Sequence, residues 1–406
     1  MKKINVASLF SGCGGMDIGF EGDFSIPHES LPNLKLKKNN FKYITVPKLK
    51  FETVFACDVN NKAQRAWENY FSKKRNISGI YHHKSIVDIV KEIKIGQLSI
   101  PRGINVVTGG FPCNDFSVAG KRLGFNSNKS HKGNGTLIND VEDDISVENR
   151  GMLYYWMREF IGLTAPHVFY AENVKGLVSL GDAKDIIASD FSKINNENYF
   201  VLPVKVLRAI DYGVPQTRER VIFIGINLNK VRPSVKAYIK KNQNLPEELD
   251  LYPKETHGPN KGTLSYVGCE AAFRGLKEPE DSIDPSQRAY SKAKFMGKMQ
   301  GQSEIILNKP GPTIRAEHHG NIEFRRLGLD LGGKNLDELN KGLQQRRLTV
   351  RECARIQTFP DDFEFVKDNL LSSTDGYRLI GNAVPPLLAF HLANRLQDVW
   401  SGIFKD

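Results

Sequence analysis

Apolar runs along the chain predict buried strands, and the first of them leads directly into a glycine-rich turn. Residues 4–10 (INVASLF) form this run, and the turn 11–15 (SGCGG) and a predicted helix from Met16 follow it. A second predicted strand, 51–57, ends at Asp58. A parallel strand, a glycine turn and a helix together form a nucleotide-type site at the carboxyl end of the strand. The pattern therefore predicts an α/β fold with a ligand site at this edge of its sheet.

A helical pattern ends the chain, and the region before it is irregular. After Pro385 and Pro386, apolar residues recur at helical spacing, namely Leu388, Leu392, Leu396 and Val399. We interpret this stripe as the face of the helix that packs in the core, and we expect His391 to lie on the same helix without a catalytic role. Between 227 and 345 the periodicity weakens and prolines multiply. A chain of 406 residues favours two lobes around a cleft.

These observations predict three parts of the chain. Residues 1–226 would form a catalytic domain with an insertion at 23–50, residues 227–371 a second, smaller domain, and residues 372–406 a segment that returns to the first domain. The insertion is rich in lysine. Contact with phosphate groups is one interpretation of it, and a solvated loop is the simpler one.

Charge and cysteine usage narrow the class of protein. The formal net charge of +11 favours a polyanionic partner, although solubility alone can also explain it. The five cysteines are an odd number without a CxxC pair, which disfavours a disulfide framework and a zinc site. No apolar run approaches the roughly 20 residues that cross a bilayer. We predict a cytoplasmic protein with reduced thiols, no metal and no membrane association.

Candidate chemistry follows from four residues in chain order, which are Cys113, Glu172, Arg218 and Arg220. Addition of a thiolate to carbon 6 of a pyrimidine turns carbon 5 into a nucleophile, and this reaction needs a nucleophile, an acid and a cation. Cys113 would add to the ring, Glu172 would protonate the N3 edge, and Arg220 would hold the O2 oxygen with Arg218 nearby. Taken singly, these residues are more typical of a buried thiol and of surface charges. The ordered set favours catalysis.

The ordered motifs resemble those of the DNA (cytosine-5)-methyltransferases. Six blocks carry the resemblance: 6–20, 109–117 (GGFPCNDFS), 170–177 (YAENVKGL), 211–226, 346–363 and 377–389. The resemblance implies a Rossmann-like methyltransferase sheet, a smaller target-recognition domain, S-adenosyl-L-methionine as methyl donor and double-stranded DNA as substrate. It also implies extrusion of the target cytosine, a monomer, and a bacterial restriction-modification system whose cognate restriction endonuclease forms no stable complex with the enzyme.

The resemblance implies a set of cofactor-binding residues, namely Phe10, Gly12, Gly14, Gly15, Asp58, Ser85, Pro112 and Asn382. Asp58 would hydrogen-bond the ribose hydroxyls. Ser85 stands where the family usually has an aspartate near the adenine amine, and Asp88 is an alternative for that contact. The turn has neither the lysine of a P-loop nor GxGxxG spacing, which favours S-adenosylmethionine over a nucleotide phosphate.

The expected DNA contacts lie in two polar segments. Lys121 and Arg122 belong to a glycine-rich segment after Cys113, for which a lid over the DNA and a disordered loop are both open interpretations. In the segment 312–326, four side chains offer hydrogen-bond donors to base edges in the major groove, namely Arg315, His318, His319 and Asn321. A satisfied turn is the alternative there. No further ligand completes a metal site around the two histidines.

Two other functions remain as alternatives. The first is methylation of cytosine in RNA, and the second is a catalytically silent DNA-binding regulator. The length of the segment 227–345 favours DNA, because reading a specific duplex sequence calls for a recognition domain of that size. The presence of Cys113, Glu172 and both arginines disfavours a silent regulator.

Overall fold

The computed structural model describes residues 3–32, 42–112, 152–196, 198–297, 299–316, 322–368 and 370–405. Several predicted site residues lie outside the described residues, namely Cys113, Lys121, Arg122, His318, His319 and Asn321.

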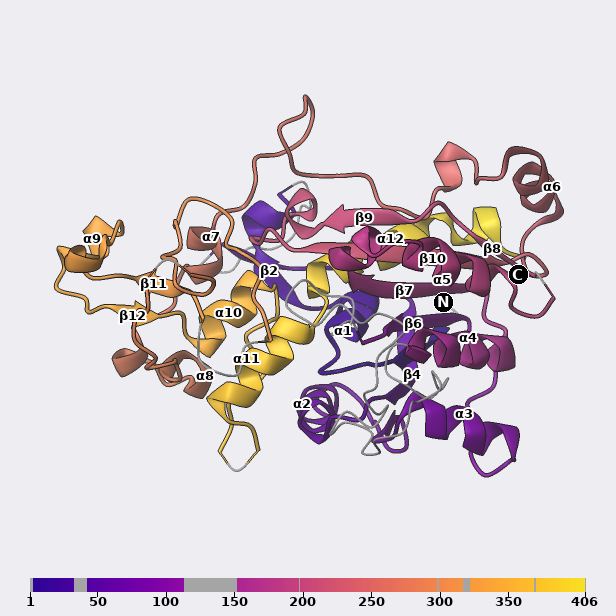
Figure 1. Cartoon of the computed structure of the whole chain (residues 1–406), viewed down its shortest axis with the longest axis horizontal. Coiled ribbons are helices and arrows are strands. Elements are labelled where there is room, and N and C mark those ends of the chain that lie inside the picture. The colour runs from indigo at the N-terminus through magenta and orange to yellow at the C-terminus, as the bar shows by residue number, and fades with distance from the viewer. Residues whose placement is uncertain are drawn as a thin grey trace.

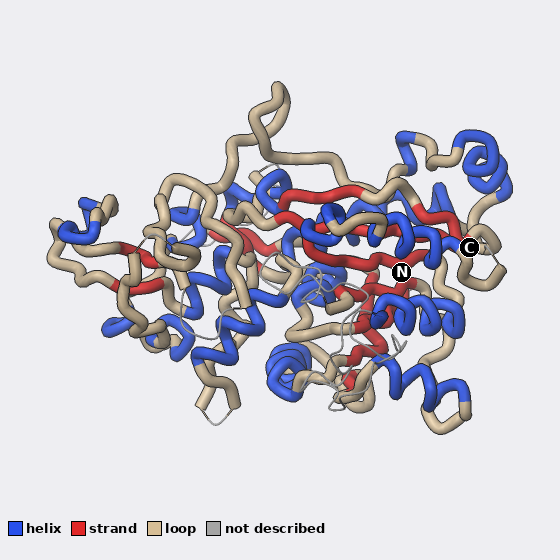
Figure 2. Tube along the Cα trace, in the orientation of Figure 1, coloured by secondary structure: helices blue, strands red, loops and turns tan. Residues whose placement is uncertain are grey.

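A single large sheet organises the described part of the chain (Figures 1 and 2). Its eight strands follow the order β5-β4-β1-β6-β7-β10-β8, with β9 also paired to β10. They are β1 (Ile4–Leu9), β4 (Phe51–Cys57), β5 (Tyr81–His82), β6 (Val106–Gly110), β7 (Val168–Val174), β8 (Tyr199–Val201), β9 (Lys205–Arg208) and β10 (Glu219–Asn227). The strands from β5 to β7 are parallel, and β10 runs antiparallel to its neighbours. The predicted α/β fold with a Rossmann-like sheet is confirmed.

Helices cover both faces of this sheet. One hydrophobic core includes α1 (Gly15–Glu21), α2 (Asn61–Phe71) and α12 (Pro386–Ile403), and the other includes α3 (Ile86–Lys94), α4 (Leu153–Thr164) and α5 (Ala183–Ser192). Alternate strand residues enter the two cores, as Tyr170 and Phe169 of β7 illustrate. Because both faces are buried, the strands appear in the sequence as nearly continuous apolar runs.

Shorter elements lie to one side of the sheet (Figure 1). They are α7 (Cys269–Phe273), α8 (Pro285–Arg288), β11 (Phe324–Arg326), α9 (Leu336–Leu339), β12 (Arg346–Arg347), α10 (Val350–Ile356) and α11 (Ser373–Asn382). By contrast, α6 (Pro233–Asn242) lies near the end of α12, where the amide of Arg232 donates to the carbonyl of Ile403 at 2.9 Å. The predicted domain boundaries remain a prediction.

The described ends of the predicted insertion form a small hairpin of β2 (Ser25–Pro27) and β3 (Tyr43–Thr45). The hydroxyl of Tyr43 donates to the carbonyl of Ala272 in α7 at 2.7 Å. Glu29 forms an ion pair with Arg274 at 2.7 Å. The hairpin therefore connects the sheet region to the shorter elements. None of the described helices combines the length and the apolar character that a membrane span requires.

The helices α1 and α12 pack in direct backbone contact. A Cβ atom on Gly19 would lie 2.4 Å from both the Cβ of Ala389 and the carbonyl oxygen of Pro386. We expect Gly19→Ala to lower the free energy of unfolding by about 1–3 kcal/mol, because the two helices must separate. Urea denaturation measures this change. Gly162→Ala in α4 is the control: its nearest neighbour would be 3.4 Å away, so it should leave stability unchanged or raise it by up to about 1 kcal/mol. Equal stability of the two variants would contradict this account of the packing.

His391 makes the stability of the fold depend on pH. Burial, together with the nearby His257, lowers the pKa of this imidazole to about 4 in the folded protein. An unfolded chain, with a histidine pKa of about 6.5, binds the proton more readily, so the folded state loses stability as the pH falls from about 6.5 to about 4. Between pH 7 and pH 4.5, wild type should lose about 2–3 kcal/mol more than His391→Gln. Denaturation of both proteins at the two pH values is the measurement, and parallel pH dependences would contradict the prediction.

Candidate active site

The predicted site residues gather where the parallel strands end. The glycine turn follows β1, Asp58 follows β4, Gly110 ends β6, and Glu172 lies close to the end of β7. Because β1, β4, β6 and β7 are parallel, all these ends lie at one edge of the sheet. The sheet thus brings the predicted cofactor residues next to the predicted catalytic carboxylate.

Asp58 organises the glycine turn. Its carboxylate accepts hydrogen bonds from the amide of Gly12 at 3.0 Å and from the amide of Asn60 at 2.8 Å. The hydroxyl of Tyr81 donates to the carbonyl of Gly12 at 2.9 Å. Burial raises the pKa of Asp58, against the effect of the two amides. A fixed carboxylate with remaining acceptor capacity suits the hydroxyls of a ribose.

Close contacts explain the next two glycines. Gly14 has a φ of 87°, and a Cβ atom there would lie 2.6 Å from the Trp67 ring. At Gly15 a Cβ atom would lie 2.3 Å from the carbonyl oxygen of Val384. The turn therefore lies against the chain that follows Asn382, the exposed last residue of α11. The structure brings these predicted cofactor residues together.

The remaining cofactor residues sit at the same edge with different environments. Phe10 adopts a left-handed φ of 51° at the end of β1, and Pro112 is half-buried after β6. Ser85 is buried and caps α3, where its hydroxyl accepts from the amide of Val87 at 3.3 Å. Capping α3 is a structural role that the sequence analysis did not assign to Ser85.

Asp17 is a site residue that sequence reasoning missed. It is buried, and its carboxylate accepts from the Ser11 hydroxyl at 2.6 Å and from the Trp67 indole at 2.7 Å. These bonds tie the glycine turn to α1 and α2. Its position in the first turn of a helix after a glycine turn was the available signal.

Glu172 and Arg220 form the centre of the predicted catalytic group. The Nε of Arg220 lies 2.5 Å from the Oε1 of Glu172, and both side chains are about one-tenth exposed. Gly110 is the partner of Glu172 in the β6–β7 register. A Cβ atom on Gly110 would lie 2.8 Å from the Oε2 of Glu172. The missing side chain therefore makes room for the carboxylate.

Asn173 connects this pair to the segment that leads to Cys113. Its side-chain amide is buried and donates to the carbonyl of Phe111 at 3.2 Å. The same side chain accepts from the amide of Val174 at 2.8 Å. The chain therefore approaches Cys113 from a position beside Glu172.

Arg218 has contacts that differ from those of Arg220. It is buried and donates to the carbonyl of Ile314 at 3.0 Å and to the carbonyl of Gly381 at 2.9 Å. Gln216 binds the same segment, because its side chain accepts a hydrogen bond from the amide of Ile314 at 3.1 Å. Arg218 thus fixes neighbouring segments, and the catalytic role predicted for it stays a prediction.

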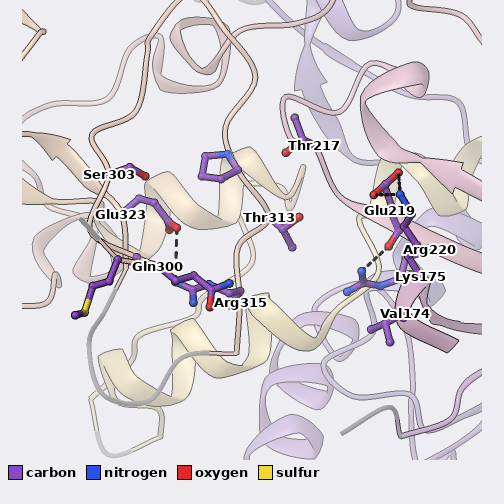
Figure 3. Close-up of a pocket in the computed structure, with 14 residues that line it drawn as sticks. Val174, Lys175, Thr217, Glu219, Arg220, Gln300, Ser303, Thr313, Arg315 and Glu323 are labelled. Atoms are coloured by element: carbon purple, nitrogen blue, oxygen red, sulfur yellow. Dashed lines mark hydrogen bonds and ion pairs between the residues drawn. The ribbon is translucent and has the colours of Figure 1, made fainter. Parts of the chain in front are cut away.

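A pocket of about 480 Å³ opens beside Arg220 (Figure 3). Lys175 and Glu219, which pair at 2.9 Å, line it on the same side as Arg220. The opposite wall includes Gln300, Ser303, Glu323 and Arg315, with 3.7 Å between the last two side chains. Of the predicted base-reading residues, Arg315 is the one that the structure describes, and it shares the pocket with Arg220.

Comparisons with known proteins agree with this site. Residues 4–398 match the family described as C-5 cytosine-specific DNA methylase. The chain is 31% identical to the Type II methyltransferase M.BsuRI of Bacillus subtilis, over 98% of this chain and 80% of that protein. It is 30% identical to the Type II methyltransferase M.BspRI of Lysinibacillus sphaericus, over 100% and 84% of the two proteins.

Solved structures share the fold. A putative DNA modification methyltransferase encoded within an E. coli prophage superposes with a TM-score of 0.57 at 18% identity, covering 98% of this chain and 100% of the other. The S. pombe Dnmt2 methyltransferase superposes with a TM-score of 0.55 at 14% identity, covering 98% and 99%. At such identities the likeness concerns the fold alone.

We expect Gly110→Ala to break the ion pair between Glu172 and Arg220. The new methyl group would overlap the Glu172 carboxylate, whose Oε2 lies 2.8 Å from the required Cβ position. A crystal structure of the variant should show the Nε–Oε1 distance lengthened from 2.5 Å to beyond salt-bridge range, about 4 Å. Gly162→Ala serves again as the control. An unchanged ion pair in Gly110→Ala would show that the site tolerates the side chain.

Proposed function

The chain belongs to the family of C-5 cytosine-specific DNA methylases, and from this premise we propose that it flips a target cytosine out of duplex DNA and methylates carbon 5 through a covalent adduct with Cys113. It is a DNA (cytosine-5)-methyltransferase of the Type II restriction-modification kind, and its cofactor is S-adenosyl-L-methionine. The observation that carries the proposal is the Glu172–Arg220 pair, which stands beside the pocket and beside the strand that leads to Cys113.

The described residues fit this cofactor. Asp58 offers acceptors for ribose hydroxyls, and the turn 10–15 contains no basic side chain for a phosphate. When bound, S-adenosylmethionine supplies the methyl group as an electrophile. Gly14 lies against the Trp67 ring and Gly15 against the Val384 carbonyl, so the glycine turn has no room for a larger side chain at either position.

The cysteines support the choice of nucleophile. The other four, Cys13, Cys57, Cys269 and Cys353, are buried, and burial raises the pKa of each thiol. A thiol held in its neutral form is a poor nucleophile. Cys113 is the fifth cysteine, and it follows the strand that ends beside Glu172.

In the proposed reaction the flipped base separates Glu172 from Arg220, and each side chain then contacts the base. The Cys113 thiolate forms a bond to carbon 6, and the electron pair of the 5,6 double bond makes carbon 5 nucleophilic. Glu172, which takes up a proton from solvent as the base displaces Arg220, gives that proton to N3, and Arg220 stabilises the O2 oxygen. After carbon 5 takes the methyl group, loss of its proton and departure of the thiolate restore the 5,6 double bond, and the N3 proton returns to Glu172.

The pocket suits a base and its flanking DNA. Its volume of about 480 Å³ lies within the usual range of about 300–1,000 Å³ for ligand sites. Arg315 on the far wall is our proposed base reader, together with His318, His319 and Asn321, and we propose that Lys121 and Arg122 contact DNA near Cys113. We further propose that the enzyme is a monomer and that a cognate restriction endonuclease shares its recognition sequence without forming a stable complex.

We expect Cys113→Ala to abolish methylation and covalent trapping. Duplex DNA with 5-fluorocytosine at the target should form a denaturation-resistant adduct with wild type, because the fluorine blocks the final elimination. The target sequence comes from bisulfite sequencing of a host that has no other cytosine methylation. Cys269→Ala is the control, since it removes a buried thiol and should still be trapped.

Two results would count against this function. Methylation at the wild-type rate by Cys113→Ala would exclude the covalent mechanism. Methyl transfer to tRNA and not to plasmid DNA would replace the DNA substrate with RNA.

A further inference from the structure

One buried guanidinium shapes the wall of the pocket that faces Arg220. Arg347 on β12 is 1% exposed. It donates to the carbonyls of Ala293 at 2.7 Å, Lys294 at 2.9 Å and Gly301 at 2.8 Å, and to the side-chain oxygen of Gln302 at 3.1 Å. The same guanidinium donates to the carbonyl of Ile322.

Four of these acceptors, on Ala293, Lys294, Gly301 and Gln302, belong to the segment that supplies the pocket wall, and Ile322 lies outside it. Met299, Gln300, Gly301 and Ser303 line the pocket. Gln300 and Ser303 lie opposite Lys175 and Arg220 (Figure 3). The described residues from 291 to 303 contain turns and bends but no helix and no strand. Turn bonds and a bond from the Phe324 amide to the Ser303 carbonyl at 2.9 Å also hold this stretch. Since it lacks a regular hydrogen-bond ladder, the fixed fork of the Arg347 guanidinium supplies most of the side-chain donors to its carbonyls.

Phe324 completes the support for this arginine. The guanidinium carbon of Arg347 lies 4.0 Å from the centroid of the Phe324 ring. A planar cation held against an aromatic face has a defined orientation as well as a defined position. The hydrogen bonds therefore point in set directions toward the wall segment.

The neighbouring Arg346 has a different task. Its side chain pairs with Glu278 at 3.0 Å and with Glu352 at 2.8 Å. Glu352 also completes the capping box that begins α10. Arg346 thus stabilises the elements behind the pocket, and Arg347 contacts the wall segment itself.

We propose that Arg347 is a positioning residue for DNA recognition: it holds residues 299–303 as the pocket wall opposite Arg220 and so sets the affinity and the sequence discrimination of the enzyme for DNA. The proposal rests on the proposed function, because it takes this pocket as the DNA site. Arg347 itself is buried beneath the wall.

The test compares Arg347→Lys with wild type. A lysine ammonium keeps the charge but has neither five donors nor a planar fork, so it cannot hold all these acceptors. We expect the KM for the cognate duplex to rise about tenfold to a hundredfold, and the preference over a duplex with one changed base to fall. The kcat at saturating DNA and the calorimetric affinity for S-adenosylmethionine should stay at wild-type values.

Arg395→Lys is the matched control. Arg395 also holds a loop through backbone carbonyls, those of Asp250 and Glu248 at 2.7 Å each, and it does not line the pocket. It should leave the KM for DNA unchanged. Hydrogen exchange should show faster exchange of the amides in 293–302 in Arg347→Lys and not in Arg395→Lys.

The outcomes separate this role from general damage to the fold. Wild-type KM and discrimination in Arg347→Lys would overturn the proposal. So would a joint loss of kcat, cofactor affinity and melting temperature, which would mark Arg347 as a residue of overall stability. A wild-type enzyme that methylated RNA and not DNA would overturn the proposed function and this role together.

Discussion

The geometry of the site depends on the hydrogen bonds that the buried Arg218 side chain donates to two distant segments of the backbone. A buried guanidinium is strongly destabilising unless acceptors surround it, and here the carbonyls of Ile314 and Gly381 supply two of them. At Gly381 a Cβ atom would lie 2.1 Å from the carbonyl carbon of Arg315. Three segments that are distant in sequence therefore meet with no space between them. Arg220 lies two residues after Arg218, so the Glu172–Arg220 pair and the pocket wall at Arg315 are both positioned by the Arg218 hydrogen bonds.

The region beside the sheet adds a network of ion pairs to the apolar packing that it shares with the sheet. The two faces of the sheet are covered by apolar cores, whereas Glu278 lies between Arg326 at 2.6 Å and Arg346 at 3.0 Å. Although burial opposes it, the hydrogen bonds from these arginines lower the pKa of Glu278 to about 2. Buried ion pairs add little net stability but penalise wrong arrangements strongly. We infer that this network, added to the apolar residues that these short elements contribute to the first core, specifies their arrangement.

Local patterns in the sequence predict some of the elements and part of the site. The glycine turn, Asp58 and the final helix were recognisable because strands, glycine turns and helical stripes are local signals. The partners of Arg218 were not, since its acceptors lie near residues 314 and 381 and no short-range rule links them. The role of Arg347 was not predicted for the same reason, because its acceptors lie at residues 293–302 and 322. The cap formed by Ser85 follows a local rule, because serine before an apolar helix is a usual first cap, and the resemblance to an adenine-binding position obscured it.

The pairing of Glu172 with Arg220 bears on how the proposed site stays ready. The carboxylate of Glu172 and the guanidinium of Arg220 contact each other at 2.5 Å and are each about one-tenth exposed. Each charge therefore has a partner, and neither side chain has to turn toward solvent to find one. A flipped base must then offer both groups replacement partners, or the site is left with a buried, unpaired charge. That cost falls on any base whose edge does not offer a partner to each of the two groups. The same ion pair that orders these two side chains would therefore also contribute to the selection of cytosine.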